Sequence, residues 1–425
     1  MLHRSAQAAR RQPPRRNTAA ALCLGALALL LGACSLAPYR YQPLASFDFA
    51  ERAEALSAGG FDVRAYVPGA AEAEALLGID VYGRDIQPVW VEIRNRNETR
   101  GRVVITSIDP RYFPPAEVAW FFKPRFSKQG WRDLEARLID LALPRHIGPA
   151  ESVSGFVFTN LSPGTKAFNL DVFQGTLPLD YEQFTFFLRV PGFVPDYLEV
   201  RFDELYAADE IEAVTTDDLP AMLERFPCCT TDRSGEQRGQ PVNVFIVAEP
   251  LVLLRSLLRA GWAETPADAA GAGIGATHTL LGRPADGTFR KPRDGTTDRS
   301  ELAIWKTPVR VDGKPLWAAQ SRHAIGRRFP FGERLFGVRF DPDTSEGRNY
   351  VLQSFWYAQV LERWAIAPTN VPVSEQFPEV DFLNNPWFSR DGSDVVIWLS
   401  DQPLPMNEAG FIDWTAGPAA GTGAP

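Results

Sequence analysis

The stretch VNVFIVAEPLVLLRSLLRAG, residues 242–261, decides the fold of the second half of the chain. It begins with an almost continuous apolar run, as expected for a strand that is covered on both faces. Pro250 follows at the position of a first helical residue, and Gly261 supplies the stop after the helix. The apolar stripe of this helix is predicted to contain Leu251, Leu254, Leu257 and Leu258. This βα unit predicts a domain that is not all-β.

The sequence after this unit predicts more strands and one long helix. Residues 304–311 and 314–319 flank Asp312 and Gly313, and this dipeptide is a strong signal for a hairpin. We expect a strand, a helix and a late strand at residues 334–340, 346–364 and 394–399. The inward face of the helix is predicted to contain Tyr350, Phe355, Val360 and Leu361. The domain is therefore expected to be α/β.

The chain before this domain contains mostly β signals. Residues 89–95 alternate strictly, so that Val89, Val91 and Ile93 share one face. Further short strands are expected at residues 103–105, 156–158, 168–172 and 184–188. Short strands separated by Gly, Pro and Asn turns predict an antiparallel β-sandwich of the immunoglobulin type. One inserted helix is expected at residues 131–142, with Leu134, Leu138 and Leu141 on its stripe.

Aromatic residues are frequent in this first domain. Those in strands are expected to form the sandwich core rather than a platform for a ligand. Trp120, Phe121 and Phe122 are different, because they lie in a proline-rich stretch without alternation. We expect them in a loop at the surface.

The N-terminus has the pattern of a lipoprotein signal. Arg10, Arg11, Arg15 and Arg16 precede an apolar run at residues 18–31 that is too short to span a membrane. The run leads into LGAC at residues 31–34, which has the spacing of a bacterial lipobox. We expect removal of residues 1–33 and attachment of diacylglycerol and an N-acyl chain, such as palmitate, to Cys34. Several acyl chains anchor a protein stably, because each buried methylene contributes roughly 0.8 kcal/mol. The alternative is an ordinary signal anchor with an incidental cysteine.

The charge of the processed chain limits the classes of partner that it can bind. Without residues 1–33 the chain has 39 basic and 52 acidic side chains, a formal charge of −13. This charge disfavours binding to nucleic acid and to anionic lipid headgroups. Ser35 follows the lipobox cysteine, and the resemblance to sorted lipoproteins implies a place at the outer membrane, facing the periplasm. We therefore expect a membrane contact through the lipid, and a protein of the cell envelope as partner.

Few residues have the spacing of a catalytic or metal site. Processing leaves His146, His278 and His323, and none belongs to a metal-ligand motif. The sequence has no nucleophile elbow, and the glycine-rich residues 270–275 follow no strand, so they are interpreted as a linker. No metal and no cofactor other than the acyl chains on the cysteine is therefore predicted.

One carboxylate cluster has two interpretations. Asp341 and Asp343 precede Ser345 and Glu346 at the start of the predicted helix. They could form a cation or substrate site at the end of a strand. The other interpretation is helix capping, in which acidic and hydroxyl side chains accept the free N–H groups of the first turn.

Six fragments occur in an order that is typical of one family. They are CCTTDRSG, GQPVNVFIVA, LLRAGW, LLGRPADGTFRKPR, LAIWKTPVRVDGKPLWAA and FDPDTSEGRNYVL, which begin at residues 228, 239, 257, 280, 302 and 340. Together they resemble the LssY C-terminal-like domain over roughly residues 219–364. The family is named after a protein assigned to type I secretion, which implies a link to secretion or envelope assembly. Some members are fused to membrane phosphatase domains, but this sequence has no multi-helix membrane region.

The chain departs from the family pattern at two places. Relatives often carry histidines where this chain has Ser300 and Glu301, and again at residues 337–339, beside the Asp-Pro-Asp segment. If those histidines perform chemistry in relatives, the resemblance implies that this chain has lost it.

Cys228 and Cys229 are adjacent, and they are the only thiols left after processing and lipidation. In an oxidising periplasm they could close a vicinal disulfide, or one could be buried while its neighbour faces the other way. Metal binding is disfavoured because no matching Cys or His motif exists elsewhere. The pair mainly indicates the start of the LssY-like domain, where the chain turns toward the strand at residue 242.

The predicted fold class is α+β multidomain, with the sandwich followed by the α/β domain. The expected segments are a signal peptide, a lipidated tether, the sandwich, the LssY-like domain, a C-terminal extension with the late strand, and a disordered tail, at residues 1–33, 34–60, 61–210, 216–366, 367–404 and 405–425. The expected function is a non-enzymatic scaffold or binding module of the envelope. The alternative is a hydrolase or transferase acting on an envelope component, with a cleft formed by Asp341, Asp343, Arg348 and His323.

Overall fold

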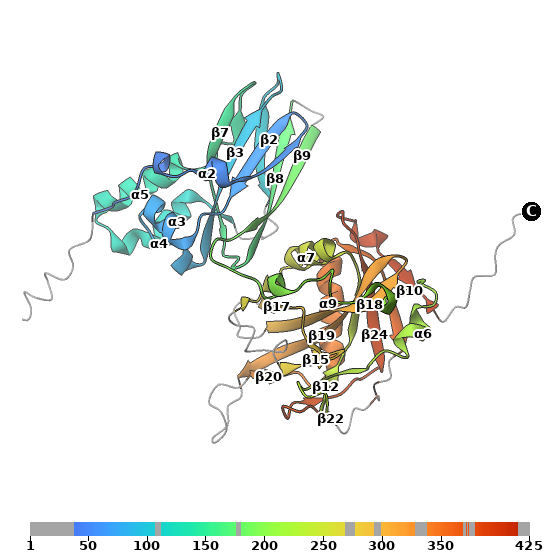
Figure 1. Cartoon of the computed structure of the whole chain (residues 1–425). Helices are drawn as coiled ribbons and strands as arrows, with labels where there is room; N and C mark the ends of the chain where they lie inside the picture. Colours follow the sequence, from blue (N-terminus) through green and yellow to red (C-terminus); the bar gives the residue numbers. More distant parts are fainter. Residues whose placement is uncertain are drawn as a thin grey trace, which may run out of the picture.

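The computed structural model describes residues 38–106, 112–175, 180–267, 277–292, 299–327, 338–368, 371, 373 and 379–414 (Figure 1). The fold is α+β, with mostly antiparallel sheets and few helices. The predicted signal peptide, Cys34, the glycine-rich residues 270–275 and residues 415–425 lie outside the described residues. No helix within the described ranges is long and apolar enough to cross a membrane.

The N-terminal part of the chain contains two antiparallel sheets. The five-stranded sheet has the order β1 (Glu54–Ala58), β2 (Phe61–Tyr66), β3 (Ile86–Asn95), β7 (Ser152–Asn160) and β5 (Tyr112–Phe113). The four-stranded sheet has the order β6 (His146–Ile147), β4 (Gly101–Thr106), β8 (Thr165–Gln174) and β9 (Asp180–Arg189). Alternate residues of both sheets, such as Val91 and Leu170, form one core. The predicted alternation of Val89, Val91 and Ile93 is confirmed, because all three are buried in that core.

Short helices cover the outer face of the five-stranded sheet. They are η1 (Leu44–Ser46), α2 (Phe49–Arg52), α3 (Ala70–Leu77), η2 (Tyr82–Arg84), α4 (Pro115–Phe122), η3 (Lys123–Arg125) and α5 (Lys128–Asp140). They pack on Trp90, Phe156 and Phe158, which point away from the core between the sheets. The inserted helix predicted at residues 131–142 is present as α5, and begins earlier at an N-cap, Ser127.

The prediction of a surface loop around Trp120 is wrong. Residues 115–122 form α4, with Pro115 in its first turn. Val118, Ala119 and Phe122 are buried at helical spacing, so the helix is held by one apolar face. Phe122 is therefore a core residue, whereas Trp120 and Phe121 are exposed as expected.

The C-terminal part is organised around a ten-stranded sheet. Its main order is β14 (Ala263–Glu264), β17 (Gly287–Pro292), β18 (Arg299–Val311), β19 (Lys314–Arg327), β13 (Val244–Val247), β24 (Ser393–Leu399), β21 (Leu361–Pro368) and β25 (Gly410–Ile412). β10 (Glu212–Val214) also pairs with β18, and β20 (Val338–Phe340) with β19. The hairpin predicted at Asp312 and Gly313 is confirmed, since both have the positive φ angles that this turn needs. The late strand β24 lies between β13 and β21, in the middle of this sheet.

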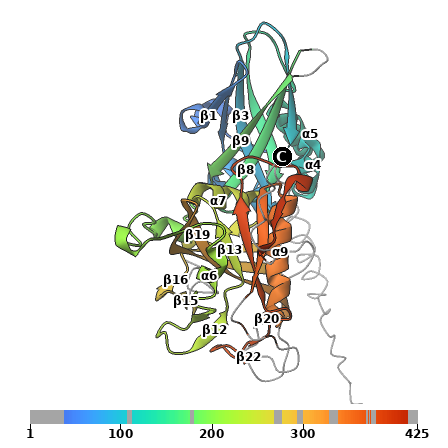
Figure 2. The ribbon, with the colours of Figure 1, turned by 90° about the vertical axis from the view of Figure 1, so that its right-hand side faces the viewer.

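Both faces of β13 are buried, as its continuous apolar sequence predicts. Val244 and Ile246 pack against α7 (Pro250–Arg259) and α9 (Thr344–Tyr357). Phe245 packs on the opposite side, in the cluster that contains α6 (Leu219–Leu223). Figure 2 shows α9 running along one face of the sheet. The remaining short helices are η4 (Asp196–Glu199), η5 (Ala208–Glu210) and η7 (Met406–Glu408).

Two details of the predicted helices need correction. The helix expected at residues 346–364 ends at Tyr357, and Leu361 already belongs to β21. Gln359 adopts a positive φ of 59°, which ends the helix and turns the chain into the strand. In α7 the buried stripe contains Leu253, whereas Leu251 is 54% exposed.

The final described residues are ordered, although their composition favoured a tail from residue 405. They form η7 and then β25, which pairs in parallel with β21. Trp364 and Phe411 contact each other across this pair, with ring centroids 4.7 Å apart. An apolar contact and strand pairing thus hold a segment that composition alone predicts to be disordered.

Two small sheets lie beside the large one. The first contains β12 (Arg238–Pro241), β11 (Cys229–Thr231), β15 (Thr279–Leu280) and β16 (Arg283–Pro284). The second is a hairpin of β22 (Glu379–Val380) and β23 (Pro386–Trp387).

The two parts meet at the segment that follows β9. Pro195 forms an isolated bridge with Pro266, and the backbone N–H of Asp196 donates to the carbonyl of Thr265 at 3.0 Å. The buried Glu264 carboxylate accepts hydrogen bonds from the backbone N–H of Thr165, at 2.5 Å, and from the hydroxyl of Tyr197. Glu264 therefore connects the C-terminal part to β8 of the N-terminal part.

Candidate functional site

An open groove of about 1160 Å³ runs along the outer side of α9. Its walls come from the end of β19, the connection between β20 and α9, the helix itself, residue 390, and η7. The lining includes His323, Asp341, Asp343, Glu346, Asn349, Tyr350, Gln353, Trp356, Tyr357, Arg390 and Met406. Three of the four predicted cleft residues, His323, Asp341 and Asp343, therefore lie around one hollow.

The two aspartates are engaged in local structure. Asp343 is the N-cap of α9, and its Oδ1 accepts from the backbone N–H of Ser345 at 3.0 Å. Its Oδ2 accepts from Arg390 Nε at 2.9 Å. Asp341 Oδ1 accepts from the backbone N–H of Asp343 at 3.0 Å. This geometry is that of helix capping, the second interpretation of the cluster.

Arg348 does not line this groove. Its guanidinium binds the carboxylate of Asp391 through two hydrogen bonds, at 2.9 and 2.7 Å, and also binds the carbonyl and hydroxyl of Ser393. This pairing lowers the pKa of Asp391 to about 2. Successive helical residues are about 100° apart, so Arg348 projects from a different side of α9 than Glu346. The predicted cleft of Asp341, Asp343, Arg348 and His323 is therefore incomplete.

His323 lies on β19, directly opposite Ser300 of β18. Its Nδ1 is 3.1 Å from Ser300 Oγ, and its ring lies 6.2 Å from that of Tyr350. A serine beside a histidine resembles a nucleophile with its base. However, Ser300 is only 1% exposed, so its hydroxyl cannot contact a substrate in the groove. No group of three or more metal-ligating side chains occurs within the described residues.

Aromatic residues that the sequence did not indicate line the same groove. Tyr357 is 70% exposed and Trp356 is 37% exposed at the end of α9. Trp356 Nε1 donates to the carbonyl of Met406 at 2.8 Å, which fixes its ring beside η7. Exposed rings next to the carboxylate and amide groups of Glu346, Asn349 and Gln353 suit the binding of an extended ligand.

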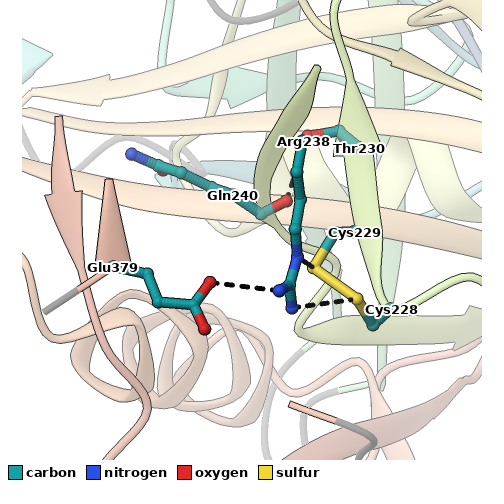
Figure 3. The surroundings of a disulfide bond; sticks show 6 residues. All are labelled: Cys228, Cys229, Thr230, Arg238, Gln240 and Glu379. Atoms are coloured by element: carbon teal, nitrogen blue, oxygen red, sulfur yellow. Dashed lines mark hydrogen bonds and ion pairs between the residues drawn. A yellow bond between two sulfur atoms is a disulfide. The ribbon is translucent and has the colours of Figure 1, made fainter. Parts of the chain in front are cut away.

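Cys228 and Cys229 form a disulfide (Figure 3). The guanidinium of Arg238 approaches both sulfurs, with Nε 3.2 Å from Cys229 and Nη2 3.4 Å from Cys228. Arg238 also forms an ion pair with Glu379 of β22, at 3.1 Å. Trp387 packs against the disulfide from the same hairpin. The pair thus lies where the first small sheet supports the second, away from the groove residues.

The remaining predicted positions are separate from the groove. His146 is exposed on β6, and His278 is fully buried beside Phe382, with ring centroids 4.8 Å apart. Glu301, one of the two residues at which the sequence departs from the expected family pattern on β18, accepts hydrogen bonds from Arg322 at 2.9 and 2.7 Å. A comparison with models of protein families and with curated proteins finds no match for this chain.

Proposed function

We propose that this chain is a lipid-anchored protein of the bacterial cell envelope whose C-terminal part is a binding module. The anchor is Cys34, carrying diacylglycerol and an N-acyl chain, and it holds the protein at the outer membrane, facing the periplasm. The N-terminal part is an immunoglobulin-like sandwich. The C-terminal part is assigned to the LssY C-terminal-like family by its ordered sequence fragments, and its partner is an envelope protein rather than nucleic acid.

One observation supports binding over catalysis. The groove along α9 presents exposed rings and amides, whereas the predicted catalytic residues are engaged in structural contacts. Asp343 caps α9 and binds Arg390, and Arg348 lies outside the groove, paired with Asp391. A general acid or base must be within reach of a substrate and able to exchange a proton. A ligand that lies along the helix needs only the exposed side chains.

The alternative is a hydrolase or transferase acting on an envelope component. The adjacency of His323 and Ser300, beside Asp341, favours this alternative. Some positions where relatives carry histidines lie on β18 and β20. Both strands pair with β19, which contains His323. Asp341→Asn separates the two functions, because it would abolish a turnover but leave binding along α9 largely unchanged.

The test is photo-crosslinking in cells that produce the full chain. A photoreactive amino acid replaces Gln353 in the groove, and a control replaces the exposed Glu236, which lies between β11 and β12. We expect a discrete adduct with an envelope protein from position 353 only. Tyr357→Ala should weaken this adduct about tenfold, because truncation of an aromatic ring that anchors a partner costs more than about 1 kcal/mol of binding free energy.

Two results would contradict the proposal. Equal adducts at both positions, or none at 353, would show that the groove does not bind a partner. The anchor is tested separately by labelled palmitate, which the wild type should incorporate and Cys34→Ala should not. A Cys34→Ala variant that keeps the label and stays in the membrane fraction would disprove the anchor.

A further inference from the structure

A surface of aromatic and basic side chains lies on α4, η3 and the start of α5. We call it the α4–α5 surface, and it consists of Trp120, Phe121, Lys123, Arg125 and Lys128. Trp120 is 58% exposed, which is unusual for so large an apolar ring. Lys123 Nζ lies 4.1 Å from the ring centroid of Trp120 and 4.7 Å from that of Trp131. Figure 1 shows α3, α4 and α5 grouped beside the sheets of the N-terminal part.

The charge of this surface is opposite to that of the whole protein. Between Glu117 and Asp133 the sequence has no acidic residue but contains Lys123, Arg125, Lys128 and Arg132. All four of these basic residues are exposed. The negative charge of the processed chain acts weakly here, because charges are screened beyond about 8 Å at physiological ionic strength. The local positive charge therefore determines what can approach the α4–α5 surface.

The start of the described chain contacts the same region. The ring of Tyr39 packs edge-on against Phe126, with centroids 5.7 Å apart, and its hydroxyl donates to the carbonyl of Leu77 at 2.8 Å. Phe126 directly follows Arg125 in the turn between η3 and α5. From Pro38 back to Cys34 the chain can reach at most about 14 Å. An acylated Cys34 would thus hold the membrane within this distance of Pro38.

We propose that the α4–α5 surface lies in the headgroup layer of the membrane that holds the lipid anchor, and binds anionic phospholipid there. Tryptophan and basic side chains are enriched at this depth, because their rings and stems contact acyl chains while their polar ends reach the headgroups. Basic residues near a membrane add electrostatic attraction to anionic lipids. The inference rests on the proposed anchor at Cys34. It assigns α4 and α5 the role of orienting the protein on the membrane.

Fluorescence quenching in vesicles tests this contact. The full lipidated chain is placed in vesicles of phosphatidylethanolamine and phosphatidylglycerol whose acyl chains carry bromine, which quenches nearby tryptophan. Five other tryptophans, Trp262, Trp305, Trp317, Trp387 and Trp398, are almost fully buried. We expect quenching in the wild type and the loss of at least half of it in Trp120→Phe. Trp356→Phe is the matched control, because Trp356 is also exposed but lies in the groove.

The charge requirement is tested with Lys123→Gln/Arg125→Gln/Lys128→Gln in the same vesicles. We expect this variant to lose most of the quenching, and the wild type to lose it when phosphatidylglycerol is replaced by phosphatidylcholine. Palmitate incorporation is measured in each sample. If the wild type in phosphatidylglycerol vesicles incorporates palmitate but shows no quenching, or if Trp120→Phe and the wild type are quenched equally, the membrane contact of the α4–α5 surface is disproved and the anchor is unaffected. A wild type without palmitate would disprove the anchor and the surface with it.

Discussion

At the scale of single residues, the sequence located part of the candidate site. The Asp-Pro-Asp segment and His323 were predicted to belong together, and the groove brings them together. Arg348 belongs to the same predicted cleft because it lies in the same family-like segment, but a helix places neighbouring residues on different sides. Trp356 and Tyr357 were missed because residues 346–364 were treated as one core helix. Three consecutive rings at residues 355–357 are a signal against this, since one helix face cannot bury all of them.

The ion pair of Arg348 predicts a measurable cost of its loss. The side chain of Arg348 is almost fully buried, and it gives hydrogen bonds to Asp391 and to Ser393. Arg348→Ala should lower the free energy of unfolding by about 2 kcal/mol, because these acceptors lose a charged donor and Asp391 is only partly screened by solvent. The measurement is unfolding by urea at pH 7. The pKa of Asp391 is held at about 2, so the part of the effect that comes from its charge should persist down to about pH 4 and be lost as pH falls through about 2, whereas the part from the hydrogen bonds to Ser393 should remain.

Arg390→Ala is the control for this measurement. Arg390 also pairs with an aspartate, Asp343, but its side chain is mostly exposed. It should therefore cost less than about 1 kcal/mol. An equal loss in the two variants would contradict a structural role that is specific to Arg348.

At the scale of elements, alternation and turn signals predicted strands well and helix limits poorly. β3, β13, β24 and the hairpin of β18 and β19 agree with their patterns because side-chain period and turn chemistry are local properties. The end of α9 depends on a positive φ at Gln359, a residue type that gives no such signal. α4 was missed because its buried face is short, and β25 because its pairing partner lies far away in sequence.

The disulfide at the first residue of β11 predicts a small effect on global stability. A link between adjacent residues closes a very short loop, so it removes little entropy from the unfolded chain. Cys228→Ser/Cys229→Ser should lower the free energy of unfolding by about 1 kcal/mol, compared with about 3 kcal/mol for a disulfide that closes fifteen residues. The measurement is denaturant unfolding, together with thiol titration of the wild-type protein before and after reduction.

The titration should find no free thiol before reduction and two afterwards, since Cys34 is expected to be acylated. Arg238→Ala, with both cysteines kept, is the control for the packing of the hairpin formed by β22 and β23. It removes the ion pair to Glu379 but keeps the disulfide. Two free thiols in the untreated protein would contradict the disulfide.

At the scale of the whole molecule, the sequence predicted an α+β fold but not how its sheets meet. The junction depends on carboxylates that come from distant parts of the chain. Glu264 follows α7 and binds β8, while Asp196 is the first residue of η4 and binds β17. Neither residue belongs to a motif, because each acts only after both parts have folded. Such contacts become visible only in the folded chain.

The junction predicts a dependence of stability on pH. Burial raises the pKa of Asp196 to about 6, although Thr288 donates two hydrogen bonds to its carboxylate. The folded state then binds a proton more tightly than the unfolded state, whose aspartate has a pKa near 3.9. The stabilising contribution is therefore complete below about pH 4 and is lost as pH rises through about 6.

Asp196→Asn, which keeps an acceptor for Thr288 without the charge, should remove this loss. Between pH 5 and pH 7 its free energy of unfolding should rise relative to the wild type by about 1 kcal/mol, measured by urea unfolding. The exposed Asp209→Asn is the control and should follow the wild-type profile; a parallel profile in Asp196→Asn would show that this carboxylate is not the source of the pH dependence.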